Sequence, residues 1–242
     1  MESKITQHSA KPRISAKNAS IATVLVGPQK DRFHIHKDLL THYSPFFRAA
    51  LSGNFKEAEE HTVTLPEECP KTFEYFVHWL YNQRLPDEDD ATEFHEQWSS
   101  PTDDGEMKTG SLIHLYVLCD KYSIPQLKIA ATNELFDHVH RSTEPTNLPE
   151  PEHVEFAFSQ LDEKSGLCRF LVDMYCFWGD MEQWDALRDA EFPKPFLFKV
   201  LSQYSTVACG GPQYPEAGIF VCKYHEHKTG REQHDCSRTS WG

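Results

Sequence analysis

Apolar residues recur at three- and four-residue intervals along much of the chain, and this spacing predicts amphipathic helices. The pattern is clear in three sets: Phe73, Phe76, Val77 and Leu80; Leu112, Leu115, Tyr116 and Cys119; and, after Pro125, Leu127, Ala131 and Leu135. Each set forms one stripe that a helix can bury. Brief apolar runs near residues 21–26, 33–35 and 62–65 predict strands between or before helices. Strands interleaved with packed helices indicate an α+β fold.

The stretch FHIHKDLLTHYSPFF, residues 33–47, predicts a short strand followed by two small helices with one apolar face each. Ser44 before Pro45 marks the start of the second helix. A serine hydroxyl can accept a hydrogen bond from an unpaired N–H there, and proline suits the first helical position. We expect Leu40 and Phe47 in the core, with Leu80 against them. The residues that define the spacing are Phe33, His36, Lys37, Leu40, Ser44 and Phe47.

This spacing closely resembles the core pattern of the BTB (or POZ) domain family. The resemblance extends over roughly residues 20–140, with one insertion, and includes a long helix over 70–85 that carries a Trp-Leu-Tyr signature. The chain is most similar to short fungal-type members, in which one BTB domain precedes a helical tail without a catalytic domain. The resemblance implies a small sheet capped by helices, followed by a helical extension. It also implies a non-catalytic protein–protein interaction module and no enzymatic activity.

The chain departs from the family in its first strand, where Ile21 or Ala22 stands in the place of a usual aspartate. In the family that acid lies near the basic residue that corresponds to Lys37. The resemblance therefore does not carry over a charged pocket at this point, although it does carry over the fold.

The resemblance also implies a partner. Many BTB proteins bind a cullin through the hairpin and the loop after it, where a hydrophobic residue, any residue and Glu recur. Phe55-Lys56-Glu57 fits this pattern, so we expect Phe55 exposed with Glu57 close by. A capping turn before the third strand, with Phe55 packed inward, is the alternative interpretation. The implied function is an adaptor or scaffold that recruits proteins to a cullin-based ubiquitin ligase. Homo- or hetero-oligomerisation, for example as a dimer in transcriptional control, is the alternative.

The net charge of −13 is concentrated in one block. Residues 87–106 contribute −9 through nine acidic residues and no Lys or Arg, which leaves −4 for the rest. A block this self-repelling and poor in apolar residues predicts an irregular insertion, either a solvated spacer or an acidic docking segment. No basic stripe with interleaved aromatics indicates nucleic-acid binding. No run of about 18 apolar residues predicts a membrane span.

The length of 242 residues suits one domain with an extension. We expect a polar, disordered tail over 1–19 without the apolar core of a signal peptide, and the BTB domain over 20–140. A proline-rich boundary then leads to a helical extension over 150–205 and a C-terminal strand or tail over 206–242. Seven cysteines without framework spacing favour a reducing compartment, the cytoplasm or nucleus.

The C-terminal tail holds a cluster of possible metal ligands within fifteen residues: Cys222, His225, His227, His234 and Cys236. Zinc takes four thiolate or imidazole ligands in a tetrahedron, and short ligand pairs in loops suit it. The preferred set is Cys222, His225, His227 and Cys236, with the two imidazoles on one face of a strand.

Two observations oppose the metal interpretation. The spacings match no standard zinc finger, and a chain with 14 histidines forms clusters by chance. A terminal strand over residues 219–224, followed by a disordered end, is the alternative. No carboxylate pair or Gly-rich phosphate loop predicts catalytic residues, and no cofactor other than a structural zinc is expected. A zinc-dependent enzyme or metal sensor is the third hypothesis for function.

Overall fold

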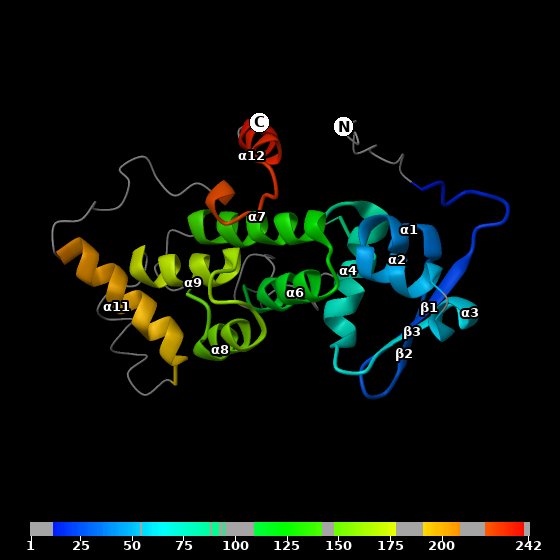
Figure 1. The fold of residues 1–242 in the computed structure, drawn as a ribbon, viewed down its shortest axis with the longest axis horizontal. Helices are drawn as coiled ribbons and strands as arrows, with labels where there is room; N and C mark the ends of the chain where they lie inside the picture. The colour runs from blue at the N-terminus through cyan, green and yellow to red at the C-terminus, as the bar shows by residue number, and fades with distance from the viewer. Residues whose placement is uncertain are drawn as a thin grey trace, which may run out of the picture.

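The computed structural model describes residues 12–53, 55–87, 89–91, 94, 109–141, 148–177, 191–208 and 221–239. A small sheet with its helices forms one end of an elongated molecule, and further helices form the rest (Figure 1). The elements are β1 (Ile21–Val26), β2 (Asp31–His36), α1 (Lys37–Tyr43), α2 (Pro45–Ser52), α3 (Lys56–Glu60), β3 (Thr62–Leu65), α4 (Pro70–Asn82), α6 (Thr109–Lys121), α7 (Pro125–Arg141), α8 (Pro151–Gln160), α9 (Gly166–Phe177), α11 (Lys194–Ala208), the 3-10 turn η1 (Val221–Lys223) and α12 (Gly230–Thr239). The α+β prediction is confirmed.

The sheet has three strands in the order β2-β1-β3, and β1 is its central strand. β1 pairs antiparallel with β2 and parallel with β3. Alternate residues of β1, namely Ala22, Val24 and Val26, are fully buried, because one face of the sheet packs against the helices. Gly27 ends β1 with a φ of 73°, which favours glycine. A Cβ there would also lie 3.1 Å from the ring of Pro70.

Ser44 joins the helical hairpin α1–α2 to the end of α6. Its hydroxyl oxygen accepts from the backbone N–H of Phe47 at 3.1 Å, so the predicted N-terminal cap of α2 is confirmed. The same hydroxyl donates to the carbonyl of Tyr122 at 2.6 Å in a buried position. Phe47 lies beneath this link, fully buried, with its ring stacked on Phe76 and Tyr122. Leu40 and Leu80 are buried in the same core, as expected.

Helices α4, α6 and α7 are buried more widely than a single stripe predicts. In α4, Tyr75 and Trp79 are buried together with Phe73, Phe76 and Leu80 of the predicted stripe, whereas Val77 is only partly buried. Helix α6 buries residues on every side, since α4, α7 and α8 all pack against it. The predicted stripes of α6 and α7 lie in this common core. The sheet end and the helical extension therefore share one hydrophobic core.

Helix α11 departs from the prediction. In the sequence, the three- and four-residue spacing of Leu197, Val200, Leu201 and Tyr204 predicts that these residues form its buried face. The structure instead buries Phe196 and Val200, while Leu201 is 67% exposed. The buried face of α11 is therefore turned about the helix axis relative to the predicted face. An aromatic contact explains this change, because the ring of Phe196 packs against Tyr175 of α9 at a centroid distance of 5.1 Å. Phe196 and Val200 are one turn apart, so they present one face to α9 together.

The expected terminal strand over 219–224 is also wrong where the structure describes it. Residues 221–223 form the turn η1, and 219–220 lie outside the described residues. The side chains of Lys223 and Tyr224 both reach Asp173, at 2.8 and 2.6 Å. Consecutive side chains of a strand point to opposite faces, so this double contact excludes an extended strand. The α12 helix follows where a disordered end was the alternative.

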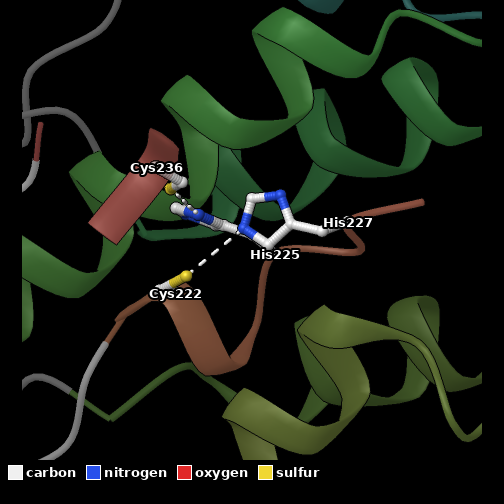
Figure 2. Close-up of side chains that lie close together, drawn as sticks. All are labelled: Cys222, His225, His227 and Cys236. Atoms are coloured by element: carbon white, nitrogen blue, oxygen red, sulfur yellow. Dashed lines mark hydrogen bonds between the residues drawn. The ribbon is translucent and has the colours of Figure 1, made fainter. Parts of the chain in front are cut away.

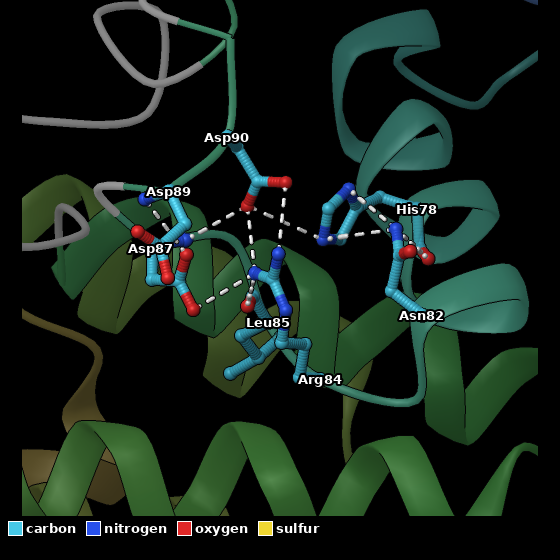
Figure 3. Close-up of polar contacts among 7 residues, drawn as sticks. All are labelled: His78, Asn82, Arg84, Leu85, Asp87, Asp89 and Asp90. Carbon is cyan, nitrogen blue, oxygen red and sulfur yellow. Dashed lines mark hydrogen bonds and ion pairs between the residues drawn. The ribbon is translucent and has the colours of Figure 1, made fainter.

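The beginning of the acidic block is bound by Arg84 (Figure 3). The guanidinium lies 2.9 Å from Asp87 and contacts both carboxylate oxygens of Asp90, at 2.7 and 3.1 Å. The hydrogen bond from Arg84 lowers the pKa of Asp90 despite some burial. His78 of α4 lies 3.6 Å from the same carboxylate. The positive charge of Arg84 therefore reduces the repulsion between the carboxylates at the start of the acidic block.

Two predicted segments lie largely outside the described residues. Of the insertion over 87–106, the structure describes 87, 89–91 and 94. Of the N-terminal tail over 1–19, it describes 12–19, which form turns with backbone hydrogen bonds. The irregular insertion and the disordered tail stay predictions. In the described part of the chain, no helix is long and apolar enough to cross a membrane.

Phe47→Ala should destabilise the sheet end strongly. Removal of a fully buried phenylalanine loses its transfer free energy and leaves a cavity, at a cost of about 3–5 kcal/mol. The matched control is Phe198→Ala, because Phe198 is 74% exposed and its loss should change stability by only about 0.5 kcal/mol. Chemical denaturation followed by circular dichroism measures both. Equal midpoints for Phe47→Ala and the parent would contradict the assignment of this hairpin to the core.

Candidate functional site

The predicted partner-binding residues lie at the start of α3, with Phe55 on the turn after α2 and Glu57 inside the helix. Phe55 occupies the position before α3 and is 64% exposed, so the inward-packed alternative is wrong. Its ring lies against Gly53, where a Cβ would come within 2.9 Å of the ring. Glu57 is exposed in the first turn of α3. The aromatic ring and the carboxylate are therefore both exposed to solvent. Helix α3, which they begin, lies beside the sheet at one end of the molecule (Figure 1).

The family-signature residues are mostly structural. Phe33 is partly buried and packs edge-on against Phe73 at 5.0 Å. His36 ends β2, and its Nδ1 lies 2.8 Å from the hydroxyl of Tyr81, which also accepts from the His36 N–H. Lys37 begins α1 and is partly buried. These contacts hold the hairpin against α4.

The second site involves residues 221–227, which dock on the helices through Glu226, a glutamate whose side chain is 39% exposed. One Glu226 oxygen accepts from the Tyr116 hydroxyl at 3.1 Å and from the Gly166 N–H at 2.7 Å. The other accepts from Lys128 at 2.6 Å. Burial raises the pKa of Glu226, but the hydrogen bonds from Lys128 and Gly166 outweigh it, and the net pKa is lowered. The carboxylate thus joins α6, α7 and α9 to the C-terminal segment.

Tyr224 supplies a second anchor. The side chain is fully buried, and its ring packs edge-on against Phe170 at 4.8 Å. Its hydroxyl donates to Asp173, a buried carboxylate of α9 that also accepts from Gln203 of α11 at 2.8 Å. Burial raises the pKa of Tyr224, and the bond to Asp173 raises it further. The phenol therefore stays protonated and keeps donating.

Gly166 makes this docking possible at the start of α9. A Cβ at this position would lie 1.9 Å from the carbonyl oxygen of Tyr224, which is a backbone atom that no rotamer change can move aside. The close approach lets the Gly166 N–H reach Glu226. A residue with any side chain would separate the segment from the helix.

The preferred metal ligands lie together on this docked segment (Figure 2). The ligand atoms of Cys222, His225, His227 and Cys236 all lie within 4.8 Å of one another, and His234 is not part of the group. η1 presents Cys222, α12 presents Cys236, and the connecting loop presents both histidines. The expected placement of both imidazoles on a strand is wrong.

The four side chains form two close pairs. His225 Nδ1 lies 3.1 Å from Cys236 Sγ, and His227 Nε2 lies 3.3 Å from Cys222 Sγ. The two imidazole rings meet edge to face at 5.5 Å. Burial lowers the pKa of His225 to about 4, with the neighbouring His227 as the second cause. Burial raises the pKa of the Cys222 thiol, and Cys236 adds to the effect.

Sequence reasoning missed the residues that position the cluster. Asn133 of α7 holds His225 Nε2 at 2.8 Å through its amide oxygen. Glu226, Tyr224 and Gly166 dock the segment that carries the ligands. Asn133 is separated from His225 by 92 positions, and such partners have no local sequence signal. The one sequence signal was the position of Tyr224 and Glu226 among the clustered cysteine and histidine residues.

Comparison with known proteins relates the N-terminal part of the chain to one family. Residues 15–97 match the BTB/POZ domain. This range contains the strands, α1–α4 and every family-signature residue. A 53-residue stretch is 36% identical to Kelch-like ECH-associated protein 1A of Danio rerio and covers 22% of this chain. That match spans 9% of the zebrafish protein.

Gly166→Ala should release the C-terminal segment from the helices. The clash with the Tyr224 backbone costs about 1–3 kcal/mol, as overpacking of a close contact does. Gly230→Ala is the control, since nothing lies within 4 Å of a Cβ there. Hydrogen–deuterium exchange should show faster exchange of residues 221–227 in Gly166→Ala and parental exchange in Gly230→Ala. Unchanged protection in Gly166→Ala would contradict the docking described above.

Proposed function

Residues 15–97 form a BTB/POZ domain, a protein–protein interaction module, and we propose that the chain is a non-catalytic adaptor or scaffold that binds a cullin. The adaptor would recruit a client protein to a cullin-based ubiquitin ligase in the cytoplasm or nucleus. The observation that carries this proposal is the exposed Phe55 followed by Glu57, on the loop where the family resemblance implies cullin contact. The client would bind through the helical extension, the acidic segment or the C-terminal tail.

Phe55 has the physical properties of an interface anchor. Exposed apolar residues are common, but a largely exposed aromatic ring flanked by charge is where small interfaces concentrate their energy. Burial of the ring by a partner would gain roughly 1.5–3 kcal/mol from apolar area alone. The ring rests against Gly53 at the end of α2, so part of its conformational freedom is already lost before binding.

The charge around Phe55 indicates the character of the partner surface. Glu57, Glu59 and Glu60 are exposed on α3, where Lys56 forms an ion pair with Glu60 at 3.5 Å. The remaining carboxylates give this surface a negative character. A partner surface with an apolar pocket and basic residues around it would complement the loop.

Oligomerisation without ligase involvement is the competing function. In the family, self-association often uses the first strand and the hairpin. The outer strands of the sheet in this chain are β2 and β3, and Ile21 at the start of β1 is 45% exposed. Self-association through these strands does not need Phe55, so the two functions can be separated by substitution.

The double variant Phe55→Ala, Glu57→Lys should lose cullin binding while folding and self-association stay intact. Loss of a central anchor costs at least about 2 kcal/mol, or a more than tenfold weaker dissociation constant. Binding to purified cullins is measured by co-purification and by titration, and the melting temperature checks the fold. The control is Phe198→Ala, Glu155→Lys, which removes the same residue types and makes the same charge change at exposed positions on α11 and α8, away from the Phe55 loop.

Three outcomes contradict the proposal in different ways. Unaltered cullin binding by the double variant rules out this surface. A lower melting temperature for the double variant shows that Phe55 is structural. Concentration-dependent dimers in light scattering, with no cullin bound by the parent chain, support the oligomerisation function instead.

A further inference from the structure

We propose that Cys222, His225, His227 and Cys236 bind one zinc ion that fastens α12 and the loop before it to α7. This inference does not depend on the partner of the BTB/POZ domain. It rests on the spacing of the four ligand atoms, on the orientation of His225, on the chemistry of the donor set and on the composition of α12. The ion has a structural role and no catalytic one.

The spacing of the ligand atoms suits a tetrahedral zinc ion. Zinc–sulfur bonds of about 2.3 Å and zinc–nitrogen bonds of about 2.0–2.1 Å place neighbouring ligand atoms about 3.3–3.8 Å apart in a tetrahedron. The His225–Cys236 and His227–Cys222 pairs lie at 3.1 and 3.3 Å, and every other pair lies within 4.8 Å. Side-chain adjustments of about 1 Å complete the tetrahedron.

The orientation of His225 is already that of a metal ligand. Its Nε2 lies 2.8 Å from the Asn133 amide oxygen, which can only accept, so Nε2 carries the proton. The neutral ring then has its lone pair on Nδ1, the atom that faces Cys236. Metal-binding histidines commonly donate their second N–H to such an oxygen, which fixes tautomer and orientation. Asn133 is therefore a positioning residue for this ligand.

The donor set selects zinc among the common biological cations. Two sulfur and two imidazole ligands in a tetrahedron are typical of zinc, whereas calcium and magnesium require oxygen ligands. Each thiol releases its proton when it binds, and two thiolates balance the two positive charges. His225 is only 6% exposed, so a neutral centre avoids the cost of a buried net charge. The described chain also groups Glu150, Glu152 and His153, but these are oxygen-rich, mostly exposed and lack thiolates.

The composition of α12 gives a second reason for a metal. Its sequence, GREQHDCSRT, contains no aliphatic side chain larger than a glycine hydrogen and no Phe, Tyr or Trp. Cysteine is its only residue that commonly packs in a hydrophobic core. A ten-residue helix is marginal in water, and burial of an apolar face is what normally stabilises one. The loop before it is held by Tyr224 and Glu226, so Cys222 and both histidines are positioned without α12. Coordination by Cys236 would add a link between α12 and this loop.

A disulfide is the competing chemistry at these residues. The two sulfur atoms lie within 4.8 Å of each other, and neither cysteine forms a disulfide in the structure. Oxidation would consume both thiols and leave the histidines without a role. The experiment therefore has to distinguish a bound metal from an S–S bond.

The test uses the full-length chain, purified with reductant and dialysed against metal-free buffer. We expect one zinc per chain by mass spectrometry of the metal content. Cobalt substitution should give the visible bands of a tetrahedral site with two thiolates. Alkylation before and after addition of a zinc chelator should show Cys222 and Cys236 becoming reactive only after the metal is removed, with Cys69, which is exposed, reactive throughout.

Substitutions then locate the site. Cys222→Ser, His227→Asn and Cys236→Ser should each lower the zinc content at least tenfold. Cys69→Ser and His234→Asn serve as matched controls and should retain it, because Cys69 lies outside the cluster and His234 is not among the four ligands. Asn133→Leu should weaken zinc binding without abolishing it. Zinc removal should also speed hydrogen exchange in residues 221–239 while β1–β3 keep their protection.

Two results overturn the inference. One is a parent chain that contains no zinc and in which Cys222 and Cys236 either form a disulfide or are alkylated equally with and without the chelator. The other is a zinc content that stays at the parental level in the ligand variants and falls in the control variants. The alkylation result on the parent chain decides the matter even where a variant fails to fold.

Discussion

Burial of helix α6 on every side is the constraint on which the rest of the structure depends. The sheet end packs against it through α4, and the extension packs against it through α8, while α7 covers its length. The free energy gained from apolar burial is roughly proportional to the area removed from water, so a helix enclosed this fully stabilises the shared core strongly. Ser44 then fixes the hairpin to the end of α6 by a buried hydrogen bond to Tyr122.

Polar side chains at the edge of this core hold the C-terminal segment in place. The Tyr116 hydroxyl accepts from the Leu167 N–H and donates to Glu226, so one buried phenol bridges α6, α9 and the segment. Asp173 does the same for α9, α11 and Tyr224. A buried carboxylate such as Asp173 is tolerated only when hydrogen bonds satisfy it. Asp173 and the partly exposed Glu226 each accept at least three hydrogen bonds. The docked segment is thus specified by polar pairing as well as by burial.

This arrangement separates two surfaces with different chemistry. Phe55 and Glu57 lie at the start of α3, in the part of the chain that matches the BTB/POZ domain. The Cys/His cluster lies on η1, α12 and the loop between them, and α12 lies beside α7, away from α3 (Figure 1). A partner on the Phe55 loop would therefore leave the C-terminal segment free to serve another purpose.

The sequence by itself determined the α+β class, the hairpin with its Ser44 cap and the core positions of Phe47 and Leu40, because these follow from local periodicity and capping. It also brought Cys222, His225, His227 and Cys236 forward as a set, since they are close along the chain. Only the tertiary structure decided which face α11 buries, because Phe196 turns towards Tyr175 of another helix. It also replaced the terminal strand with a turn, since Asp173 binds two consecutive side chains. Asn133, Gly166 and Glu226 had no local signal, because contacts between distant segments arise from the packing of the whole core.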